Sequence, residues 1–362
     1  MIRPESCFVS VFTLVFAQPK DSLTILKSHK TFYISVFEFM DVFFYEVFDE
    51  EKQALLRYLP AGWHCGFTDL TIQESGHVDP PSPVISIRTQ SLIPPGWSAQ
   101  LSGILSRSAG FDHLNRFRAE TGTSVACGHL FRYSGRAVAE HAAMLWLALL
   151  RRLPRQQTAI TSFQRDHLTG CECQGRTLAV FGVGDIGRQV VEVGRGLGMR
   201  VIGVDLVSRF DDVDYVGRDE AVARADVAVC AMNLNETNDG YFTPAVLASF
   251  KPGAIFINVA RGEFALNSHL LDALRAGHLG GAGLDVYAAE SVIATALRGG
   301  TAGEHPELIA FRALLQRDDV IMTPHNAFNT TEAIARKSEQ SVQQLAHFFQ
   351  HGVFSTHLPR SL

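Results

Sequence analysis

The sequence predicts an α/β protein with two domains, each built on a parallel β-sheet, and a cleft between them. The length of 362 residues suggests about two domains. From Met40 onward, short apolar segments alternate with longer amphipathic ones, which is typical of β-α-β units and therefore of parallel sheets. A glycine-rich turn at Gly182–Gly187 follows one apolar segment, as expected where such a sheet binds a phosphate-bearing ligand.

The composition limits the partners that the protein can have. Apolar residues make up 46% and charged residues 19%, so the chain can bury a large core. The formal net charge of −5, without a basic run, argues against duplex nucleic acid as a partner. The six cysteines show no paired CxxC spacing, which favours a reducing, cytoplasmic location. His167, Cys171 and Cys173 are too few for a zinc site, so no metal is predicted.

Residues 1–39 come before the first clearly predicted strand. They include Cys7–Ala17, an apolar run of 11 residues that is too short to span a bilayer. Glu5 and the poor cleavage site VFA argue against an export signal. Because the sequence from Met40 begins as a domain usually begins, with a strand and a helix, we expect residues 1–39 to be a disordered tail or a mis-assigned start.

Residues 40–133 predict a first series of strands and helices. The first strand is expected at Val42–Val47 and is followed by a helix. Further strands are expected at Pro83–Arg88, Leu101–Ser108 and Ser124–His129, and the helix carries Ala54, Leu55, Tyr58 and Leu59 on one face.

The segment Gly135–Arg152 predicts one long helix rich in alanine and leucine. Arg136, Glu140 and His141 interrupt its apolar character too often for a membrane span. The helix is therefore expected to be buried between units or to lie at a subunit contact.

A second series of strands and helices follows this helix. Strands are expected at Thr177–Phe181, Arg200–Asp205, Val227–Met232, Ala254–Ala260, Gly281–Tyr287 and Val320–Pro324. A last helix from Thr331 closes the chain and places Ile334, Val342, Leu345 and Phe349 at core spacing.

The glycine-rich turn predicts a dinucleotide site. Gly182 allows the tight turn, Gly184 lets a pyrophosphate approach the N–H groups that open the next helix, and Gly187 allows close helix–strand packing. Asp205 ends the following strand near the expected offset of about 20 residues, where a carboxylate can bind a ribose diol. A Rossmann-like NAD-binding domain is therefore predicted, although nearby Arg209 leaves NADP as an alternative.

Three charged residues follow strands of this second series and predict the reaction. Arg261, Glu290 and His325 lie after three different strands, and ligands of open α/β sheets bind beyond the carboxyl ends of the strands. A guanidinium can bind and polarise a 2-keto acid, and an imidazolium can donate a proton to the carbonyl oxygen as hydride reaches the carbon. A carboxylate beside the imidazole can orient it. The set therefore predicts hydride transfer to a keto acid.

Several motifs together resemble one dehydrogenase family. The segments GVGDIG, NVARG, GLDVY and TPHNAF are similar to those of the D-isomer-specific 2-hydroxyacid dehydrogenases, and RSAGFDHLN and YSGRAVAEHAA are most similar to the D-lactate dehydrogenase branch. The resemblance covers residues 41–358. It implies a flavodoxin-like substrate domain beside the NAD-binding domain and reversible hydride transfer between NADH and a small 2-keto acid such as pyruvate.

The resemblance also implies a role for individual residues. Arg261 would polarise the carbonyl, His325 would be the acid and base, and Glu290 would tune the histidine. The substrate would contact Ala109, Gly110, Tyr133 and Phe328; the cofactor would contact Gly182, Gly184, Asp185, Ile186, Gly187, Asp205, Asn233, Asn238, Val259, Ala260 and Asp285, the last through the nicotinamide carboxamide.

The same resemblance implies a discontinuous domain arrangement. Residues 40–133 with 325–362 would form the substrate domain, and residues 134–324 would form the NAD-binding domain. The helix 135–152 would be the contact of a homodimer.

Two departures from the family pattern leave the substrate open. Asn329 follows Phe328 where lactate-type relatives often carry tyrosine, and the connection Ser291–Glu304 is long. A same-family reaction on formate, phosphite or glyoxylate and a non-catalytic NAD(H)-sensing role are the alternatives. The segment YSGRAVAEHAA favours 2-hydroxy acids, and the lack of a basic tail argues against the sensor.

Overall fold

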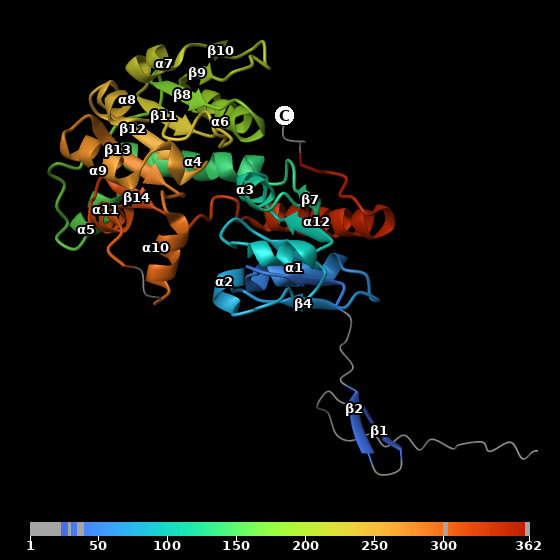
Figure 1. Ribbon diagram of the computed structural model, residues 1–362. Coiled ribbons are helices and arrows are strands. Elements are labelled where there is room, and N and C mark those ends of the chain that lie inside the picture. Colours follow the sequence, from blue (N-terminus) through green and yellow to red (C-terminus); the bar gives the residue numbers. More distant parts are fainter. Residues whose placement is uncertain (1–22, 28–29, 35–39, 300–302, 359–362) are drawn as a thin grey trace, which may run out of the picture.

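The computed structural model describes residues 23–27, 30–34, 40–299 and 303–358. It contains two α/β domains with parallel sheets, which confirms the predicted fold class (Figure 1). Near the N-terminus, β1 (Leu23–Lys27) and β2 (Lys30–Ile34) pair as an antiparallel hairpin. The rest of residues 1–39 lies outside the described residues, so the expectation of a disordered or mis-assigned extension stays a prediction.

The first domain is built on a five-stranded parallel sheet in the order β4-β3-β5-β6-β7. Its last helix, α12, comes from the C-terminal end of the chain and packs against α1 and β6, beside the blue strands in Figure 1. The strands are β3 (Val42–Phe44), β4 (Cys65–Phe67), β5 (Val84–Ile87), β6 (Gly103–Ser106) and β7 (Ala126–His129); the helices are α1 (Asp49–Tyr58), α2 (Ile72–Ser75), η1 (Pro95–Ala99), α3 (Asp112–Thr121) and α12 (Thr331–His351). We call this unit the five-stranded domain.

The second domain has a seven-stranded parallel sheet in the order β10-β9-β8-β11-β12-β13-β14. The strand order reverses between β8 and β11, which creates a crevice at the carboxyl ends of these strands. The strands are β8 (Thr177–Phe181), β9 (Arg200–Val204), β10 (Asp214–Tyr215), β11 (Val227–Cys230), β12 (Ala254–Asn258), β13 (Leu279–Leu284) and β14 (Val320–Met322). The helices are α4 (Gly135–Leu150), α5 (Leu153–Ala159), α6 (Asp185–Gly196), α7 (Arg218–Arg224), α8 (Pro244–Ala248), η2 (Gly262–Phe264), α9 (Asn267–Arg275), α10 (Glu290–Leu297) and α11 (Pro306–Leu315).

The long helix expected at Gly135–Arg152 is shorter than predicted. It ends at Leu150, and Arg152 adopts a left-handed conformation with φ of 52° before α5 begins. Pro154 lies in the first turn of α5, and a proline lacks the N–H that would continue the preceding helix. The apolar run therefore makes two helices with a break between them.

Two aromatic residues that were expected on core faces are exposed. Phe349 is 40% exposed, and its neighbour Phe348 is buried in its place. Tyr58 is 38% exposed at the last turn of α1. At the end of α12 two adjacent apolar residues fit the same periodicity, and the prediction chose the wrong one. In α1 the predicted face is confirmed at Ala54 and Leu55, and Tyr58 is exposed where the helix ends.

Some of the predicted strands extend too far at their carboxyl ends, whereas those ending at His129 and Phe181 end as predicted. The strand expected at Val42–Val47 ends at Phe44, because Glu46 adopts a left-handed conformation with φ of 56°. The strand β4 was not predicted, since it has three residues and is only half-buried. These shorter strands leave the residues that follow them free to line a site at the edge of the sheet.

A buried cluster of charges joins three elements of the five-stranded domain. Glu51 of α1 lies 2.9 Å from Arg107 Nε and 2.7 Å from Lys337 Nζ of α12, and all three side chains are fully buried. Burial opposes ionisation of Glu51, but the two cations hold its pKa below the usual value. The single carboxylate therefore compensates two cations that could not be buried alone.

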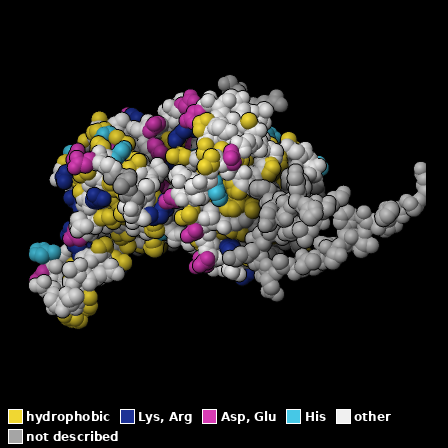
Figure 2. Space-filling model, turned by 60° about the horizontal axis from the view of Figure 1, so that its bottom comes forward, with side chains coloured by type: hydrophobic (Ala, Val, Ile, Leu, Met, Phe, Trp, Pro, Cys, Tyr) yellow, Lys and Arg dark blue, Asp and Glu magenta, His cyan; other side chains and the backbone are white. Residues whose placement is uncertain are grey.

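The charged side chains at the surface are mixed in sign. On the face drawn in Figure 2, acidic and basic side chains alternate with hydrophobic ones. Within the described residues, none of the helices combines the length and apolar content needed to cross a bilayer.

The buried cluster predicts a large loss of stability when its carboxylate is neutralised. Glu51→Gln leaves Arg107 and Lys337 buried without an anion and should lower the free energy of unfolding by about 3–5 kcal/mol. Denaturant titration followed by circular dichroism measures this change. Glu50→Gln, at the exposed neighbouring position of the same helix, should change it by less than about 0.5 kcal/mol. Equal effects of the two variants would contradict the role of the cluster.

Candidate active site

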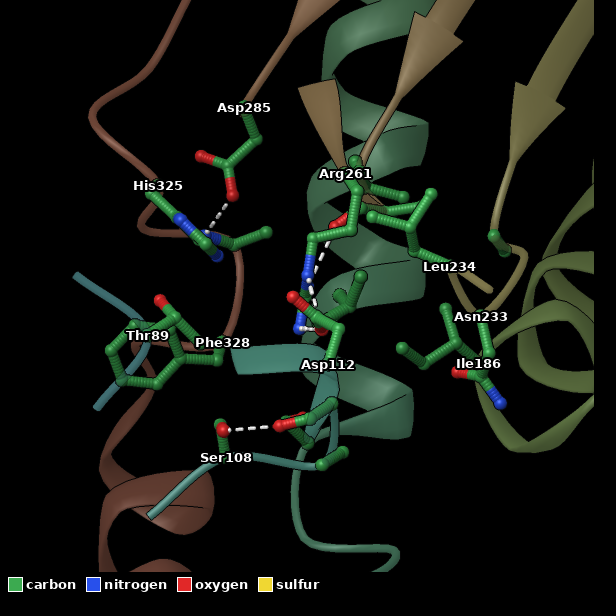
Figure 3. A pocket seen from close by; sticks show the side chains of 18 of the residues that line it. Thr89, Ser108, Asp112, Ile186, Asn233, Leu234, Arg261, Asp285, His325 and Phe328 are labelled. Atoms are coloured by element: carbon green, nitrogen blue, oxygen red, sulfur yellow. Dashed lines mark hydrogen bonds and ion pairs between the residues drawn. The ribbon is translucent and has the colours of Figure 1, made fainter. Parts of the chain in front are cut away.

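A pocket lined by residues of both domains lies at the carboxyl ends of their strands. Figure 3 shows Arg261, Asp112 and His325 pointing into it from different elements. Eleven of the predicted site residues line this pocket: Ala109, Gly110, Tyr133, Ile186, Asn233, Val259, Ala260, Arg261, Asp285, His325 and Phe328. The structure thus brings together residues that are up to about two hundred positions apart in the chain, as the strand-end rule predicts.

His325 and Glu290 form a close pair beside the pocket. His325 Nδ1 lies 2.7 Å from Glu290 Oε1, and Gln90 of the five-stranded domain donates to the same oxygen at 3.0 Å. Burial opposes ionisation of Glu290, but His325, Gln90 and Arg261 together hold the pKa of Glu290 below its usual value. An ionised Glu290 can accept a hydrogen bond from the Nδ1–H group of His325. The other ring nitrogen, Nε2, is then available for chemistry in the pocket.

The backbone at both members of this pair is unusual. His325 has φ of 51°, and Ala289, directly before Glu290, has φ of 57°. Left-handed conformations of non-glycine residues cost about 1–2 kcal/mol each and persist where the surroundings enforce them. Their occurrence on both sides of one hydrogen bond supports a functional reason for the pair.

Asp285 holds the segment that carries His325. Its buried carboxylate accepts the N–H of Asn326 at 2.8 Å, the N–H of Ala327 at 2.9 Å and the hydroxyl of Thr323 at 2.6 Å. His141 lies 2.9 Å from the same Thr323 hydroxyl. Both carboxylate oxygens of Asp285 are therefore used within the protein, whereas the sequence predicted a contact with the nicotinamide carboxamide. That contact stays a prediction, and the geometry adds a positioning role.

Arg261 is held by a contact between the domains. Asp112 Oδ1 lies 3.1 Å from Arg261 Nε and also 3.1 Å from Nη2, and Nη1 donates to the carbonyl of Ala260 at 2.8 Å. Burial opposes ionisation of Asp112, but the positive charge of Arg261 keeps the pKa of Asp112 below the usual value. A Cβ added to Gly110 would lie 1.8 Å from Arg261 Nη2. The guanidinium therefore packs directly on the Gly110 backbone.

The glycine-rich turn fits a dinucleotide. Gly182 has φ of 87°, and a Cβ there would lie 2.7 Å from Met232 Cα. A Cβ on Gly187 would lie 1.9 Å from the Gly182 carbonyl oxygen, so helix and strand pack closely as expected. A Cβ on Gly184 would meet no atom within 4 Å, which leaves open space at the first turn of α6. That space suits a pyrophosphate at a helix N-terminus.

The acidic residues near this turn bond to the protein itself. Asp205 accepts the Val183 N–H at 2.7 Å and the Val207 N–H at 3.3 Å at the end of β9. Asp185 lies 3.7 Å from Arg132 Nε, and burial raises the pKa of Asp185. Asp205 is thus placed where the second strand ends, while the Asp185 side chain faces Arg132.

Seven of the predicted site residues lie outside the pocket lining: Gly182, Gly184, Asp185, Gly187, Asp205, Asn238 and Glu290. The Asn238 side chain accepts the Asn235 N–H at 2.8 Å and donates to the Asn233 carbonyl at 2.9 Å, so it holds the turn that carries Asn233. Asn329 is exposed and does not line the pocket, although the sequence suggested it as a specificity residue. Within the described ranges, no three His, Cys, Asp or Glu side chains group as metal ligands would.

Comparison with known proteins identifies the family. The model for the D-isomer specific 2-hydroxyacid dehydrogenase NAD-binding domain matches residues 143–327. The chain belongs to this family. It is 32% identical over 248 residues to the D-specific alpha-keto acid dehydrogenase of Enterococcus faecalis, covering 68% of this chain and 75% of that protein. It is 29% identical over 251 residues to the D-lactate dehydrogenase of Escherichia coli, covering 67% and 75%.

A solved structure supports the same assignment. D-lactate dehydrogenase from Aquifex aeolicus, complexed with NAD and lactic acid, superposes with a TM-score of 0.74 at 25% identity, covering 88% of this chain and 100% of that one. The chain is therefore an NAD-dependent D-2-hydroxyacid dehydrogenase, an oxidoreductase that acts on CH–OH donors.

The pocket of this dehydrogenase also contains residues that the sequence reasoning missed. Arg88 and Thr89 follow β5, Arg107 follows β6, and Asp112 opens α3. The strand-end rule that selected Arg261 and His325 could have selected Arg88 and Arg107 as well. They were missed because the rule was applied to one sheet only.

The contact between Gly110 and Arg261 predicts a defect in substrate binding. Gly110→Ala should displace the guanidinium and lower kcat/KM about 100-fold, because a shift of about 1 Å in a positioned group can cost that much. Steady-state kinetics measures it, and NADH affinity should remain within about threefold since the cofactor turn is untouched. Gly96→Ala, where a Cβ has free space, is the control. An unchanged kcat/KM in Gly110→Ala would exclude this contact from substrate binding.

Proposed function

We propose that the protein reduces small 2-keto acids to D-2-hydroxy acids with NADH, in a reversible reaction of the D-lactate/pyruvate type. The observation that carries the proposal is the 2.7 Å pair of His325 and Glu290 in the same pocket as Arg261 and the dinucleotide turn. Hydride adds to the keto carbon and a proton adds to its oxygen, which gives the hydroxy acid and NAD⁺. Bound NADH supplies the hydride.

Arg261 is proposed to bind and polarise the keto acid. Asp112 and the Ala260 carbonyl fix its plane, and donors remain on both terminal nitrogens. A fixed guanidinium can meet the carboxylate and carbonyl oxygens through its fork and stabilise charge that develops on the carbonyl oxygen. The Asp112 contact thus orients Arg261 before the substrate arrives.

His325 is proposed to be the acid and base. Glu290 accepts a hydrogen bond from the Nδ1–H group and so orients the ring. The Nε2–H group can then donate its proton to the carbonyl oxygen of the substrate. In the reverse direction Nε2 takes the hydroxyl proton, and Glu290 stabilises the resulting imidazolium. The side-chain amide of Gln90 donates a hydrogen bond to the same Glu290 oxygen and helps to keep this carboxylate in place.

The remaining predicted contacts shape the substrate pocket. Ala109 and Gly110 are proposed to offer N–H groups to the substrate carboxylate beside Arg261. Tyr133 and Phe328 are both buried pocket residues and are proposed to limit the space around the substrate side chain. In this proposal, residues 40–133 with 325–362 bind the substrate, and residues 134–324 bind NAD.

The reaction is tested with NADH oxidation across a panel of 2-keto acids. His325→Ala should lower kcat about 100- to 10,000-fold, because it removes the general acid. NADH affinity, measured by fluorescence titration, should change little. His278→Ala, at an exposed position, is the control and should keep full activity.

Other outcomes of this panel would favour other functions. Binding of NADH without reduction of any keto acid supports an NAD(H)-sensing protein. Oxidation of formate or phosphite, or reduction of glyoxylate alone, supports another reaction of the family. Loss of NADH binding in His325→Ala would contradict the acid–base role.

We also propose a cytoplasmic homodimer that uses one face of α4 and the segment after it. Most of α4 is buried against its own domain, but Met144 and Leu147 form an exposed apolar stripe. Leu153, Ile160 and Phe163 continue the exposed apolar surface through α5 and beyond. Several large apolar side chains exposed on consecutive elements support a subunit contact there.

The dimer is tested by the mass of the protein in solution. Light scattering should give twice the monomer mass of 39.8 kDa, and the double variant Met144→Glu, Leu147→Glu should give the monomer mass. Val78→Glu, at an exposed residue of the other domain, should leave the dimer intact. A dimer that survives the double variant would exclude this face as the contact.

A further inference from the structure

We propose that Arg88 makes the enzyme select 2-keto acids that carry a second carboxylate on the side chain, such as oxaloacetate, over neutral keto acids of the same shape. The inference rests on the proposed function and specifies its substrate class. It starts from a cation in the pocket that no carboxylate of the described residues pairs.

The backbone of Arg88 is fixed at the end of β5. Glu46 accepts the N–H of Arg88 at 2.9 Å, and it also accepts the N–H groups of Gln90 at 3.1 Å and Ser91 at 3.2 Å. One buried carboxylate thus holds the whole turn after the strand. Arg88 therefore lines the pocket from a backbone position that hydrogen bonds fix.

The Arg88 side chain lies on aromatic rings. Its guanidinium carbon is 4.4 Å from the centre of the Phe328 ring and 5.9 Å from that of Phe48. The sequence predicted that Phe328 contacts the substrate, and an aromatic ring alone would make that side of the pocket apolar. Its ring instead supports a cation that lines the same pocket, so this side is charged.

Arg88 lacks the partners that the other pocket arginines have. Arg107 Nε lies 2.9 Å from Glu51, and Arg261 lies 3.1 Å from Asp112. Across the described residues, Arg88 has no carboxylate within 4.0 Å and its guanidinium makes no hydrogen bond. Its N–H groups are therefore available to a ligand.

The surrounding charges do not neutralise Arg88. Glu51 is shared by Arg107 and Lys337, and Glu46 is engaged by backbone N–H groups. Neither of these carboxylates forms an ion pair with Arg88 in the part of the chain that the structure describes. A second substrate carboxylate would supply the missing negative charge.

Arg88 lies close enough to the reacting groups to act on the same small molecule. Burial raises the pKa of Tyr133, and the Arg88 and Arg261 guanidiniums both oppose this shift. Arg88, Tyr133 and Arg261 all line one pocket, which has an empty volume of about 910 Å³. If Arg261 binds the carboxylate and keto groups of the substrate, Arg88 can bind a second carboxylate at the end of the substrate side chain.

The chemistry of the two guanidiniums explains the selectivity. A carboxylate can accept two N–H bonds from one guanidinium fork, whereas an isopropyl group of the same shape would cover the cation without bonding it. Covering a charged group without a partner is unfavourable. The hydride and proton transfers themselves are unchanged.

The test compares oxaloacetate with 4-methyl-2-oxopentanoate, whose isopropyl group has the shape of the second carboxylate. The wild-type enzyme should show a kcat/KM for oxaloacetate about 100-fold above that for the neutral acid, as expected for a charge-assisted pair. Arg88→Gln should remove this preference by lowering kcat/KM for oxaloacetate about 100-fold while changing that for the neutral acid less than about threefold.

Two variants accompany this measurement. Arg88→Lys keeps the charge but loses the fork, so its preference should be intermediate; it also provides the test if Arg88→Gln does not fold. Arg165→Gln is the matched control, because Arg165 is an exposed arginine 5.5 Å from the ring of Phe163, outside the pocket lining. It should behave as wild type.

The possible results are distinguishable. An equal loss for both substrates in Arg88→Gln would show a structural role only and overturn the inference. A wild-type preference for the neutral acid would overturn it as well, with the proposed function intact. Failure to reduce any 2-keto acid would overturn the proposed function together with the inference.

Discussion

The buried carboxylate of Asp285 fixes the segment on which the rest of the active site depends. It binds two N–H groups and one hydroxyl within the crossing from β14 to α12. A fully bonded carboxylate that is sealed from water holds a backbone firmly, because breaking any of these bonds leaves a buried charge. With this segment held, His325 keeps its left-handed conformation and faces Glu290, and the chain enters α12 at the capping residue Thr330.

Contacts between the two domains orient two further side chains of the site, Arg261 and Glu290. Asp112 of the five-stranded domain orients Arg261, and Gln90 of the same domain binds Glu290. Outside the pocket, Arg298 of the segment after α10 lies 2.7 Å from Glu74. Separation of the two domains would break all three contacts at once. The geometry of the proposed catalytic groups therefore depends on the contact between the domains.

The sequence was sufficient for the fold and for many of the residues that line the pocket, because both follow from short local patterns. The glycine-rich turn and the polar residues after buried strands identified Gly182–Gly187, Arg261 and His325. The break between α4 and α5 and the choice of Phe348 over Phe349 for the core depend on tertiary packing. The role of Asp285 could not be predicted, because its three partners are about forty residues away in the chain and become neighbours only in the folded sheet.

The residues proposed to contact the substrate side chain were harder to predict from the sequence, because they lie in a different domain from the residues proposed to carry out the reaction. The proposed acid, its partner and the polarising arginine all follow strands of the seven-stranded sheet, and they report the reaction. The groups proposed to contact the substrate side chain come mostly from the five-stranded domain, where Arg88 follows β5 and its guanidinium lies over the ring of Phe328. A motif for the reaction therefore carries no information about the side chain of the acid. In the proposed selectivity, Arg88 carries this information, because a cation in a pocket that no carboxylate of the described residues pairs is unfavourable until a ligand provides its counter-charge.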